Sequence, residues 1–540
     1  MWPSNWRERL PVILAGDWDM VIIGGGITGA GILLEAARQG LRVLLVEQRD
    51  FAWGTSSRSS KLVHGGLRYL KEGKLLLTRA SVRERENLLR EAAGLVEPQS
   101  FAFADYRGRK PGRWLFSLGL ALYDQMAGQR SRAYYPAHEF LLLAPHIARA
   151  GLDGGMCYGD AKTDDARLVL RVLQEALAAG GIAVNYLAAT QVLRSARKAD
   201  GVELLDALDG ATYTIKTKVV VSATGAWADG LRQNAAAGPK LRPLRGSHLL
   251  LPAWRLPVAQ AVSLMHPRDG RPVFAFPWEG VTLVGTTDVD HRADMKVEAS
   301  ITSEEVAYLM QALDFQFPEL GLGLDDIIAT FAGVRTVIDS GKADPSKEAR
   351  DHAVWLEHGL LTVTGGKLTT FRLIAQDALA HCAPWLPRRQ LRLHSSRTFR
   401  QPEPLPANAA LTAAQARRLQ GRYGMHAGEL LAAAHGGELA TVAGSQTLWA
   451  ELRWAARAEA VMHLEDLLLR RTRLGLQLRG GGAELLPRIR AICQAELGWS
   501  DQHWLAEEAA YLVLWRQRYS LPLRETIPDW RAAAPRPITK

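Results

Sequence analysis

The segment Asp19-Met-Val-Ile-Ile-Gly24-Gly-Gly26-Ile-Thr-Gly29 joins a short apolar run to the start of a helical pattern. Asp19–Ile23 is continuously apolar after its first residue, as expected for a buried parallel strand. Ile27–Arg38 has helical spacing, and Gly40 is placed to cap its end. The glycines between them follow the spacing G-x-G-x-x-G, which at a strand-to-helix turn is typical of a dinucleotide-binding Rossmann unit.

Each glycine of this motif has its own physical task. Gly24 permits the tight turn, Gly26 lets the backbone approach a pyrophosphate, and Gly29 allows the helix to pack closely on the strand. The helix N-terminus adds N–H groups and a partial positive charge for the phosphates. A second apolar strand, Arg42–Val46, ends at Glu47, whose carboxylate is placed to accept a hydrogen bond from a ribose hydroxyl.

Further strands with glycine-marked ends are dispersed along the chain. Lys218–Ser222 is followed by Thr224-Gly225, and Leu360–Val363 is followed by Gly365-Gly366-Lys367 and a new helix. A single G-x-G-x-x-G motif near the N-terminus, together with strands that join the same sheet much later in the chain, favours FAD over NAD as the cofactor. The pattern is that of a glutathione-reductase-like flavoprotein.

The 540 residues predict an α/β protein of about three domains. We expect a discontinuous FAD-binding Rossmann domain, an inserted mixed β-sheet domain that binds substrate, a linker rich in proline and arginine, and a C-terminal α-helical domain. In chain order the FAD-binding pieces are 17–95, 151–245 and 331–385, the inserted pieces 96–150 and 246–330, the linker 386–410 and the helical domain 411–540.

Composition narrows the class of protein. Apolar residues make up 47% and charged residues 23%, which excludes intrinsic disorder and small disulfide scaffolds. The three cysteines have no disulfide or zinc spacing, so we expect a reducing compartment and no metal site. We find neither a signal peptide nor an apolar run long enough for a membrane span, and expect a cytoplasmic chain or one lying on a membrane.

The segment Thr55-Ser-Ser-Arg-Ser-Ser-Lys-Leu-Val-His-Gly-Gly-Leu-Arg-Tyr69 concentrates hydroxyl groups, paired glycines, a histidine and three cations just beyond the second strand. It resembles the corresponding segment of the FAD-dependent glycerol-3-phosphate dehydrogenases. The resemblance covers residues 17–380 densely and the C-terminal part more loosely. It continues through Asp164-Asp-Ala-Arg167, Arg245-Gly-Ser-His248, Gly285-Thr-Thr-Asp288, Gly333-Val-Arg335 and Gly365-Gly-Lys-Leu-Thr-Thr370.

The resemblance implies flavin-dependent oxidation of sn-glycerol 3-phosphate to dihydroxyacetone phosphate. It assigns substrate binding to Arg68, Tyr69, Arg335 and Lys367, cations and donors suited to a phosphate dianion. Arg335 cannot act as a base, so we expect it to stabilise developing negative charge. His248 and His64 are the candidate acid/base groups, although each could instead be a structural histidine.

Cofactor contacts are expected from the glycine motif, the acidic strand end, the hydroxyl-rich segment and the two late strand ends. The residues are Gly24, Gly26, Thr28, Gly29, Glu47, Thr55, Ser56, Ser59, Lys61, His64, Gly65, Leu67, Thr224, Gly225, Gly366, Lys367, Leu368 and Thr369. Asp288 has no assigned role, and Asp164 or Asp165 is expected to cap the helix Ala166–Ala178.

Other functions stay open at this point. An oxidase that uses O₂ and an amino-acid or 2-hydroxy-acid oxidase share the expected fold, although a single carboxylate would need fewer cations. A flavin-binding scaffold without turnover would be expected to lack Arg335, Lys367 or His248. A nucleic-acid binder would need a recognised module or interleaved aromatics, which we do not find, so no nucleic acid is expected.

The electron acceptor is expected to be a membrane quinone, which requires the chain to lie on the inner face of a membrane. A homodimer is left open. Two surfaces are candidates for that contact: the basic cluster Arg107–Arg113 with the apolar run 114–123, and the arginine-rich tail around Arg470, Arg471, Arg473 and Arg479. The alternative for 114–123 is a buried core helix. From Arg388 to Lys540 there are 22 basic and 14 acidic residues, which is most of the net charge of +10.

Overall fold

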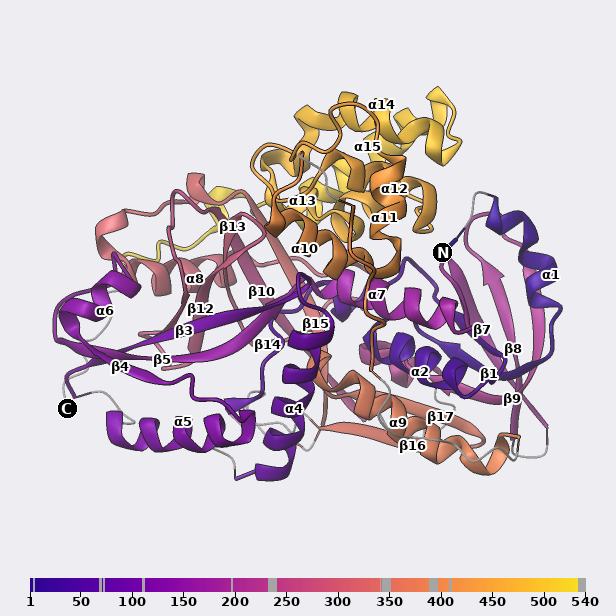
Figure 1. The fold of residues 1–540 in the computed structure, drawn as a ribbon, viewed down its shortest axis with the longest axis horizontal. Coiled ribbons are helices and arrows are strands. Elements are labelled where there is room, and N and C mark those ends of the chain that lie inside the picture. Colours follow the sequence, from indigo (N-terminus) through magenta and orange to yellow (C-terminus); the bar gives the residue numbers. More distant parts are fainter. Residues whose placement is uncertain are drawn as a thin grey trace.

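The structure is a computed structural model that describes residues 1–2, 5–67, 70, 73–108, 112–195, 198–231, 240–339, 341, 351–387, 397–406 and 410–532. The expected substrate residues Arg68 and Tyr69 lie outside the described residues. Two sheets lie side by side, and the C-terminal helices, orange to yellow, lie over the junction between them (Figure 1).

The first sheet contains the expected nucleotide-binding unit. Its eight described strands follow the order β16-β17-β9-β1-β2-β6, with β8 beside β9 and β7 beside β8. The inner pairs β17·β9, β9·β1, β1·β2 and β2·β6 are parallel, as the continuous apolar runs predict. The bounds are β1 Trp18–Ile23, β2 Val43–Val46, β6 Ile182–Val184, β7 Leu187–Ser195, β8 Lys198–Asp206, β9 Thr212–Ser222, β16 His352–Glu357 and β17 Leu360–Gly365.

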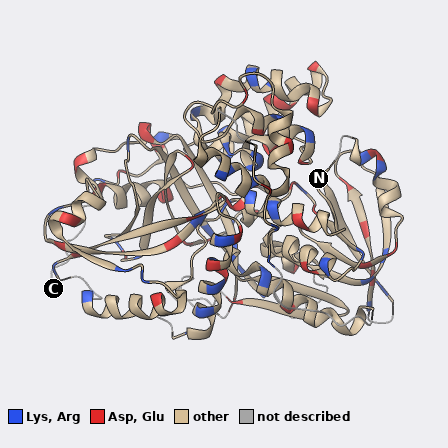
Figure 2. Cartoon of the chain, viewed as in Figure 1, with Lys and Arg blue, Asp and Glu red and all other residues tan. Residues whose placement is uncertain are grey.

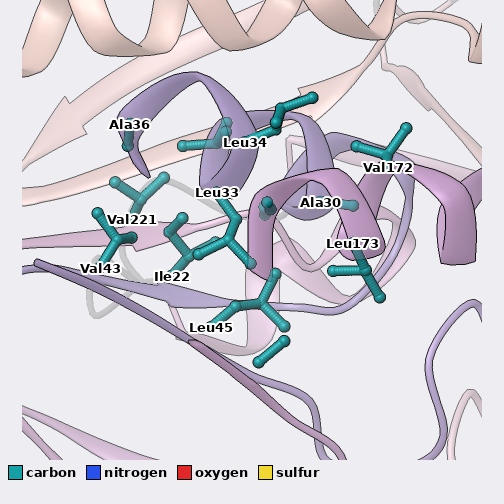
Figure 3. Close-up of a cluster of buried hydrophobic side chains, with 14 of the residues drawn as sticks. Ile22, Ala30, Leu33, Leu34, Ala36, Val43, Leu45, Val172, Leu173 and Val221 are labelled. Atoms are coloured by element: carbon teal, nitrogen blue, oxygen red, sulfur yellow. The ribbon is translucent and has the colours of Figure 1, made fainter. Parts of the chain in front are cut away.

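Among the described residues, three α-helices pack on this sheet: α2 (Ile27–Arg38), α7 (Asp165–Ala178) and α9 (Phe371–Cys382). Figure 3 shows the apolar core between the sheet and two of them, with Ile22, Val43, Leu45 and Val221 on the strands, Leu33 on α2 and Leu173 on α7. The expected cap of α7 is confirmed, because the side chain of Asp164 accepts a hydrogen bond from the N–H of Arg167 at 3.3 Å.

The second sheet is the expected mixed sheet. Within the described part of the chain it has nine strands, in the order β14-β10-β13-β12-β11-β3-β5-β4 with β15 beside β10. Only the β3·β11 pair among them is parallel. The bounds are β3 Val96–Tyr106, β4 Ala133–Pro136, β5 Leu152–Thr163, β10 Leu241–Pro252, β11 Ala261–Met265, β12 Pro272–Trp278, β13 Val281–Gly285, β14 Val289–Asp290 and β15 Ala329–Ile338.

Strand pairing differs from the expected domain boundaries at three places. Residues 151–163 and 331–338 were assigned to the FAD-binding domain, but β5 pairs with β3 and β15 pairs with β10 in the second sheet. The strand β10 likewise begins at Leu241, before the expected boundary at 246. Each of these strands is next in the chain to an element of the first sheet or its helices, since β5 precedes α7, β10 follows β9 and β15 precedes β16. Local sequence patterns do not mark where the chain passes from one sheet to the other.

The C-terminal part is helical, as predicted. Its helices are α10 Ala413–Tyr423, α11 Ala427–Ala433, α12 Trp449–Ala458, α13 Leu474–Gln477, α14 Leu486–Leu497 and α15 Asp501–Arg518, and Asp466–Arg471 forms a π-helical turn. Leu452, Leu468 and Trp504 share one apolar core with Trp278 and Phe331 of the second sheet. This domain is therefore built onto the other two. Within the expected linker, residues 388–396 and 407–409 lie outside the described residues.

Helices α4 (Leu75–Glu91) and α5 (Arg113–Ala127) pack against each other along one edge of the molecule, and Figure 2 shows α5 uncharged over most of its length. Trp114, Leu115 and Leu118 are 78%, 66% and 68% exposed. The alternative of a buried core helix is therefore wrong for this face of α5. The remaining helices are α1 Leu10–Leu14, α6 Ala137–Leu143 and α8 Ser303–Gln316.

Candidate functional site

A cleft of about 610 Å³ lies at the carboxyl ends of the parallel strands of the first sheet. Its walls include Gly24 after β1, Glu47 after β2, Thr224 after β9 and Gly366 after β17. This edge of an open parallel sheet is where such folds bind nucleotides. The four segments that the sequence marked as strand ends thus meet at one place.

The glycine motif forms a cradle that side chains would fill. Gly24 has a φ of +114°. A Cβ at Gly29 would lie 1.9 Å from the carbonyl oxygen of Gly24, and one at Gly26 would lie 3.1 Å from Ser56 Oγ. Gly26 is the N-cap of α2, whose positive end therefore faces the cleft. Space, backbone donors and charge all fit a pyrophosphate, as expected for FAD.

Glu47 is held in place by the backbone. Its Oε2 accepts a hydrogen bond from Gly25 N–H at 2.6 Å, and its Oε1 accepts one from Arg49 N–H at 2.9 Å. Burial raises the pKa of the carboxyl group, and these two hydrogen bonds oppose that shift. The carboxylate is oriented toward a cleft whose lining includes Gln48 and Arg49, which suits a ribose contact.

Three hydroxyl residues of the expected loop line the cleft: Thr55, Ser56 and Ser59. Thr55 Oγ1 donates to the carbonyl oxygen of Val334 at 2.5 Å, and Ser56 Oγ accepts from Ile27 N–H at 3.0 Å. Thr28 lines the cleft as well. These hydrogen bonds fasten the loop to β15 and to the start of α2.

Lys61 differs from its expected role as a cofactor ligand. Its side chain is fully buried, and its Nζ donates to the carbonyl oxygen of Ser57 and to Asp165 Oδ1, the latter at 2.8 Å. Burial, followed by the charge of Arg473, lowers the pKa of Lys61 to about 7. Its ammonium group faces a buried ion-pair network and is absent from the described lining of the cleft.

The opposite wall comes from the two late strand ends. Gly225 and Gly366 have φ values of +55° and +78°, and both line the cleft together with Thr224, Lys367 and Leu368. Lys367 Nζ donates to Ser81 Oγ of α4 at 2.9 Å. Thr369 is instead buried behind the wall, where its Oγ1 donates to the carbonyl oxygen of His64 at 3.2 Å.

Arg335 lines the same cleft from β15 and is held by a carboxylate. Its Nη2 lies 2.6 Å from Asp288 Oδ1. The partly exposed guanidinium can therefore present its remaining donors to an anion in the cleft. Asp288, to which the sequence assigned no role, is a positioning residue for this arginine.

His248 lies outside the described cleft lining and is almost fully buried. Its ring stacks on Phe331 at 4.5 Å between centroids, and its Nε2 lies 2.9 Å from Ser60 Oγ. Burial, followed by the charges of Lys61 and Arg335, lowers its pKa well below the ordinary value of 6.5. The imidazole is therefore neutral at physiological pH. Its partner Ser60, like His248 itself, is not among the residues that line the cleft.

Gly65 and Leu67 also lie behind the cleft wall. Gly65 N–H donates to the buried Asp160 Oδ1 at 3.0 Å, and Leu67 packs beside the core shared by the second sheet and the C-terminal helices. Within the described residues, the cleft lining includes neither these two nor His64. Their place in the sequence motif reflects the folding of the loop behind the cleft.

Sequence reasoning missed two tryptophans of the cleft, Trp53 and Trp227. Their rings lie 5.7 Å apart, Arg49 lies 4.4 Å from the ring centroid of Trp53, and Trp227 Nε1 donates to Met295 O at 2.8 Å. The available signal was their position, because Trp53 lies two residues before the segment that begins at Thr55, and Trp227 lies two residues after Gly225.

The described residues contain no group of three or more histidine, cysteine, aspartate or glutamate side chains arranged to hold a metal ion. Nor does any described helix combine the length and apolar character needed to cross a membrane.

Comparison with protein families agrees with this site. A model described as FAD dependent oxidoreductase matches residues 19–372, and one described as the C-terminal domain of alpha-glycerophosphate oxidase matches residues 384–504. The aerobic glycerol-3-phosphate dehydrogenase of Staphylococcus epidermidis is 40% identical over 368 residues, 67% of this chain and 66% of that protein. That of Staphylococcus aureus is 39% identical over 379 residues, 69% of this chain and 68% of that protein. The matched region thus spans about two thirds of the length of these relatives.

Solved structures agree at the level of the whole chain. The glycerol-3-phosphate dehydrogenase from Bacillus halodurans complexed with FAD matches with a TM-score of 0.74 and 26% identity, over 96% of this chain and 98% of that one. The L-α-glycerophosphate oxidase of Mycoplasma pneumoniae with FAD bound shares the fold, with a TM-score of 0.54 and 17% identity over 67% of this chain and 94% of that one. The predictions of the fold and of FAD are confirmed. The chain is an FAD-dependent oxidoreductase and belongs to the glycerol-3-phosphate dehydrogenase family.

Proposed function

We propose that this protein oxidises sn-glycerol 3-phosphate at C2 to dihydroxyacetone phosphate in the cleft of the first sheet. One observation carries this proposal: Arg335 of β15 and Lys367, which follows β17, line the same cleft as Gly24 and Gly26. A phosphate dianion needs several fixed donors, whereas a single carboxylate often needs one arginine. The pair of cations therefore supports a phosphorylated substrate over an amino acid or 2-hydroxy acid.

Different groups accept the hydride, stabilise the developing negative charge and bind the phosphate. When bound, FAD supplies the acceptor for the hydride that leaves C2. Arg335, oriented by Asp288 at 2.6 Å, stabilises the negative charge that develops on the C2 oxygen. Lys367, held by Ser81 at 2.9 Å, binds the phosphate group. Arg68 and Tyr69 are proposed to complete the phosphate site on the ground of family resemblance alone.

The proton of the C2 hydroxyl needs an acceptor. One candidate is the neutral imidazole of His248, whose Nε2 lies 2.9 Å from Ser60 Oγ. Neither residue is among those that line the cleft, so this role requires a proton relay between the cleft and Ser60. His64 is the other candidate, and its carbonyl oxygen is bonded to Thr369 beside the wall formed by Lys367. The depressed pKa of His248 predicts a rate that stays constant above about pH 6.5 if this residue is the base.

Anaerobic reduction of the bound flavin tests the proposal. Glycerol 3-phosphate should bleach the flavin absorbance, while glycerol, lactate and alanine should not. Lys367→Ala should weaken use of glycerol 3-phosphate, since a charge-assisted hydrogen bond to phosphate contributes about 1.5–3 kcal/mol. Bleaching by alanine or lactate instead would contradict the proposal and favour the amino-acid or hydroxy-acid oxidase.

We further propose that the electrons pass to a membrane quinone and that α5 meets the membrane. Besides the exposed apolar residues of α5, Leu76 at the start of α4 is 82% exposed. Arg113 begins α5, and Arg107 lies shortly before it, which supports contact with anionic headgroups. Faster turnover with a quinone analogue than with O₂ would support this acceptor, and efficient reduction of O₂ would favour the oxidase.

The arginine-rich tail does not serve as a second membrane surface. Arg470, Arg471 and Arg473 are at most 1% exposed and bind buried carboxylates. Arg479 is more exposed, but its guanidinium donates to the carbonyl oxygen of Asp325 at 2.8 Å. The expectation was wrong for Arg470, Arg471 and Arg473 because Asp50 and Asp165, which lie far away in the sequence, bind them in the interior, with Glu465 and Asp466 adding local partners for Arg470.

A further inference from the structure

The loop formed by residues 54–61, named the flavin loop here, lines the cleft but is irregular in structure. Gly54, Thr55, Ser56 and Ser59 face the cleft. Beyond the short 3-10 turn Thr55–Ser57, the loop has no ladder of backbone hydrogen bonds to fix its shape. Apart from the hydrogen bonds of Thr55 to Val334 and of Ser56 to Ile27, its conformation is fixed by the groups that contact its far side.

Asp165 is the main contact on that far side. Its Oδ2 accepts hydrogen bonds from Ser59 N–H at 2.9 Å and from Ser59 Oγ at 2.7 Å, and its Oδ1 accepts one from Lys61 Nζ at 2.8 Å. Asp165 is the first residue of α7, is fully buried and is not among the residues that line the cleft. One carboxylate thus fixes both the backbone and the hydroxyl of a cleft residue.

The C-terminal domain supplies the cation opposite this carboxylate. Arg473 donates to Asp165 Oδ1 and, at 2.8 Å, to the carbonyl oxygen of Ser57 in the flavin loop. Its Nε lies 3.1 Å from Asp164 Oδ1, and its side chain is 1% exposed. Its backbone has a φ of +64°, a conformation that a non-glycine residue keeps only where its surroundings hold it.

A second, separate contact joins the loop to the same domain. Arg58 Nη2 donates to Tyr519 Oη at 3.2 Å and lies 2.6 Å from Glu298 Oε1. The charge that the sequence places at Arg58 is therefore neutralised away from the cleft. The flavin loop is held from behind at two points by residues that follow α12 and α15.

We propose that Arg473 is a positioning residue for FAD, acting through Asp165 and Ser59, and that the helical C-terminal domain thereby retains the cofactor. The inference rests on the assignment of the cleft as the FAD site. The domain then has a task beyond adding stability, since removing its arginine frees the loop that contacts the cofactor.

Release of FAD from the holoenzyme tests this inference without measuring turnover. After dilution at a temperature well below unfolding, the rise of free-flavin fluorescence gives the release rate. Arg473→Met should release FAD about tenfold faster or more, because the loop loses a charge-assisted contact and Asp165 loses a partner. Arg473→Lys, which keeps a cation beside Asp165, should restore part of the retention.

Arg453→Met is the matched control. Arg453 is also a buried arginine of the C-terminal domain, but its partners Glu438 and Glu496, at 2.6 and 2.7 Å, belong to that domain. This variant should lower the melting temperature and leave the release rate unchanged. Equal acceleration by Arg453→Met and Arg473→Met would mean that Arg473 only stabilises the domain, and would overturn the inference.

A double-mutant cycle locates the route. Ser59→Ala should accelerate release by itself. Adding Arg473→Lys to it should accelerate release by less than the product of the two single effects, because Arg473 acts partly through Asp165, which binds the Ser59 hydroxyl, and partly through its own hydrogen bond to the carbonyl oxygen of Ser57. Additive effects would contradict the route through Ser59. Glu47→Ala distinguishes a failure of the cleft assignment from a failure of the positioning role. If neither Glu47→Ala nor Ser59→Ala changes the release rate of FAD, the cleft is not the FAD site. If both change it and the Arg473 variants do not, only the positioning role of Arg473 is refuted. If Arg473→Met does not fold, the comparison of Arg473→Lys, Ser59→Ala and their combination tests the positioning role of Arg473 in its place.

Discussion

Helix α5 and the segment Asp466–Arg473 both place arginines beside large apolar residues, yet these side chains are exposed on α5 and buried in Asp466–Arg473. On α5 the apolar residues Trp114 and Leu118 are largely exposed, and Arg113 lies 5.0 Å from the ring centroid of Trp114. In Asp466–Arg473 both kinds of side chain are buried.

Carboxylates from the distant FAD-binding domain account for the difference. Asp50, which follows β2, accepts hydrogen bonds from Arg470 and Arg471, 420 and 421 residues away in the chain. Each arginine is neutralised as it is buried, which is the condition under which a charge can enter a protein interior. A basic and apolar pattern therefore indicates a membrane surface only where the fold brings no acidic partner to it.

The largest expected effect comes from removing the shared carboxylate. Asp50→Asn leaves two buried guanidinium groups short of a partner, and should lower the free energy of unfolding by about 3–5 kcal/mol. Urea unfolding measures this. The same substitution at Asp153, which pairs with the exposed Arg107 at 3.4 Å, should cost less than about 1 kcal/mol. Equal losses in the free energy of unfolding for Asp50→Asn and Asp153→Asn would mean that the buried ion pairs stabilise the protein no more than the exposed one does.

The exposed face of α5 should be dispensable for folding and important for membrane binding. Trp114→Ser with Leu118→Ser should weaken sedimentation with anionic vesicles at least about tenfold, since each side chain contributes on the order of 1.5–3 kcal/mol when it leaves water. The free energy of unfolding of this double variant should change by no more than about 0.5 kcal/mol. Unchanged vesicle binding together with lower stability would mean that this face packs against protein.

Acid should weaken the buried pairs in a defined range of pH. Burial alone would raise the pKa of Asp50, but the guanidinium groups of Arg471 and Arg470 lower it from 3.8 to about 2. A carboxyl group with a lowered pKa in the folded state stabilises the protein above pH 3.8, and this contribution is lost as the pH falls toward 2. The stability difference between the wild type and Asp50→Asn should therefore shrink by about 2 kcal/mol over that range. A difference that is independent of pH would contradict this assignment.

The smallest expected effect concerns a single cation of α5. Arg113→Gln should reduce binding to anionic vesicles about fivefold at low salt, because one cation near such a surface is worth about 1 kcal/mol. The effect should vanish at high salt, where exposed charges are screened. An effect that persists at high salt would indicate that Arg113 contributes by packing on Trp114.

Local patterns predicted much of the fold and of the site. Helix Ile27–Arg38 has the bounds expected from its spacing, and strands β1, β2 and β17 begin within one residue of the expected positions. Gly24, Gly26 and Thr28 of the glycine motif line one cleft with Thr224 and Gly366, which follow β9 and β17. Such features depend on neighbours in the sequence and on the rule that parallel strands end at one edge of a sheet.

The sequence by itself therefore determined the nucleotide cradle, the FAD-dependent class and the helical character of the C-terminal part. Only the tertiary structure decided which charged side chains face the cleft and which are buried behind it. Lys61 and Arg335 both stand in glycine-marked motifs, but Asp165 holds the first inside the protein and Asp288 holds the second at the cleft. The direction of a charged side chain is set by the partner that neutralises it, and those partners come from elements that meet only after the chain has folded.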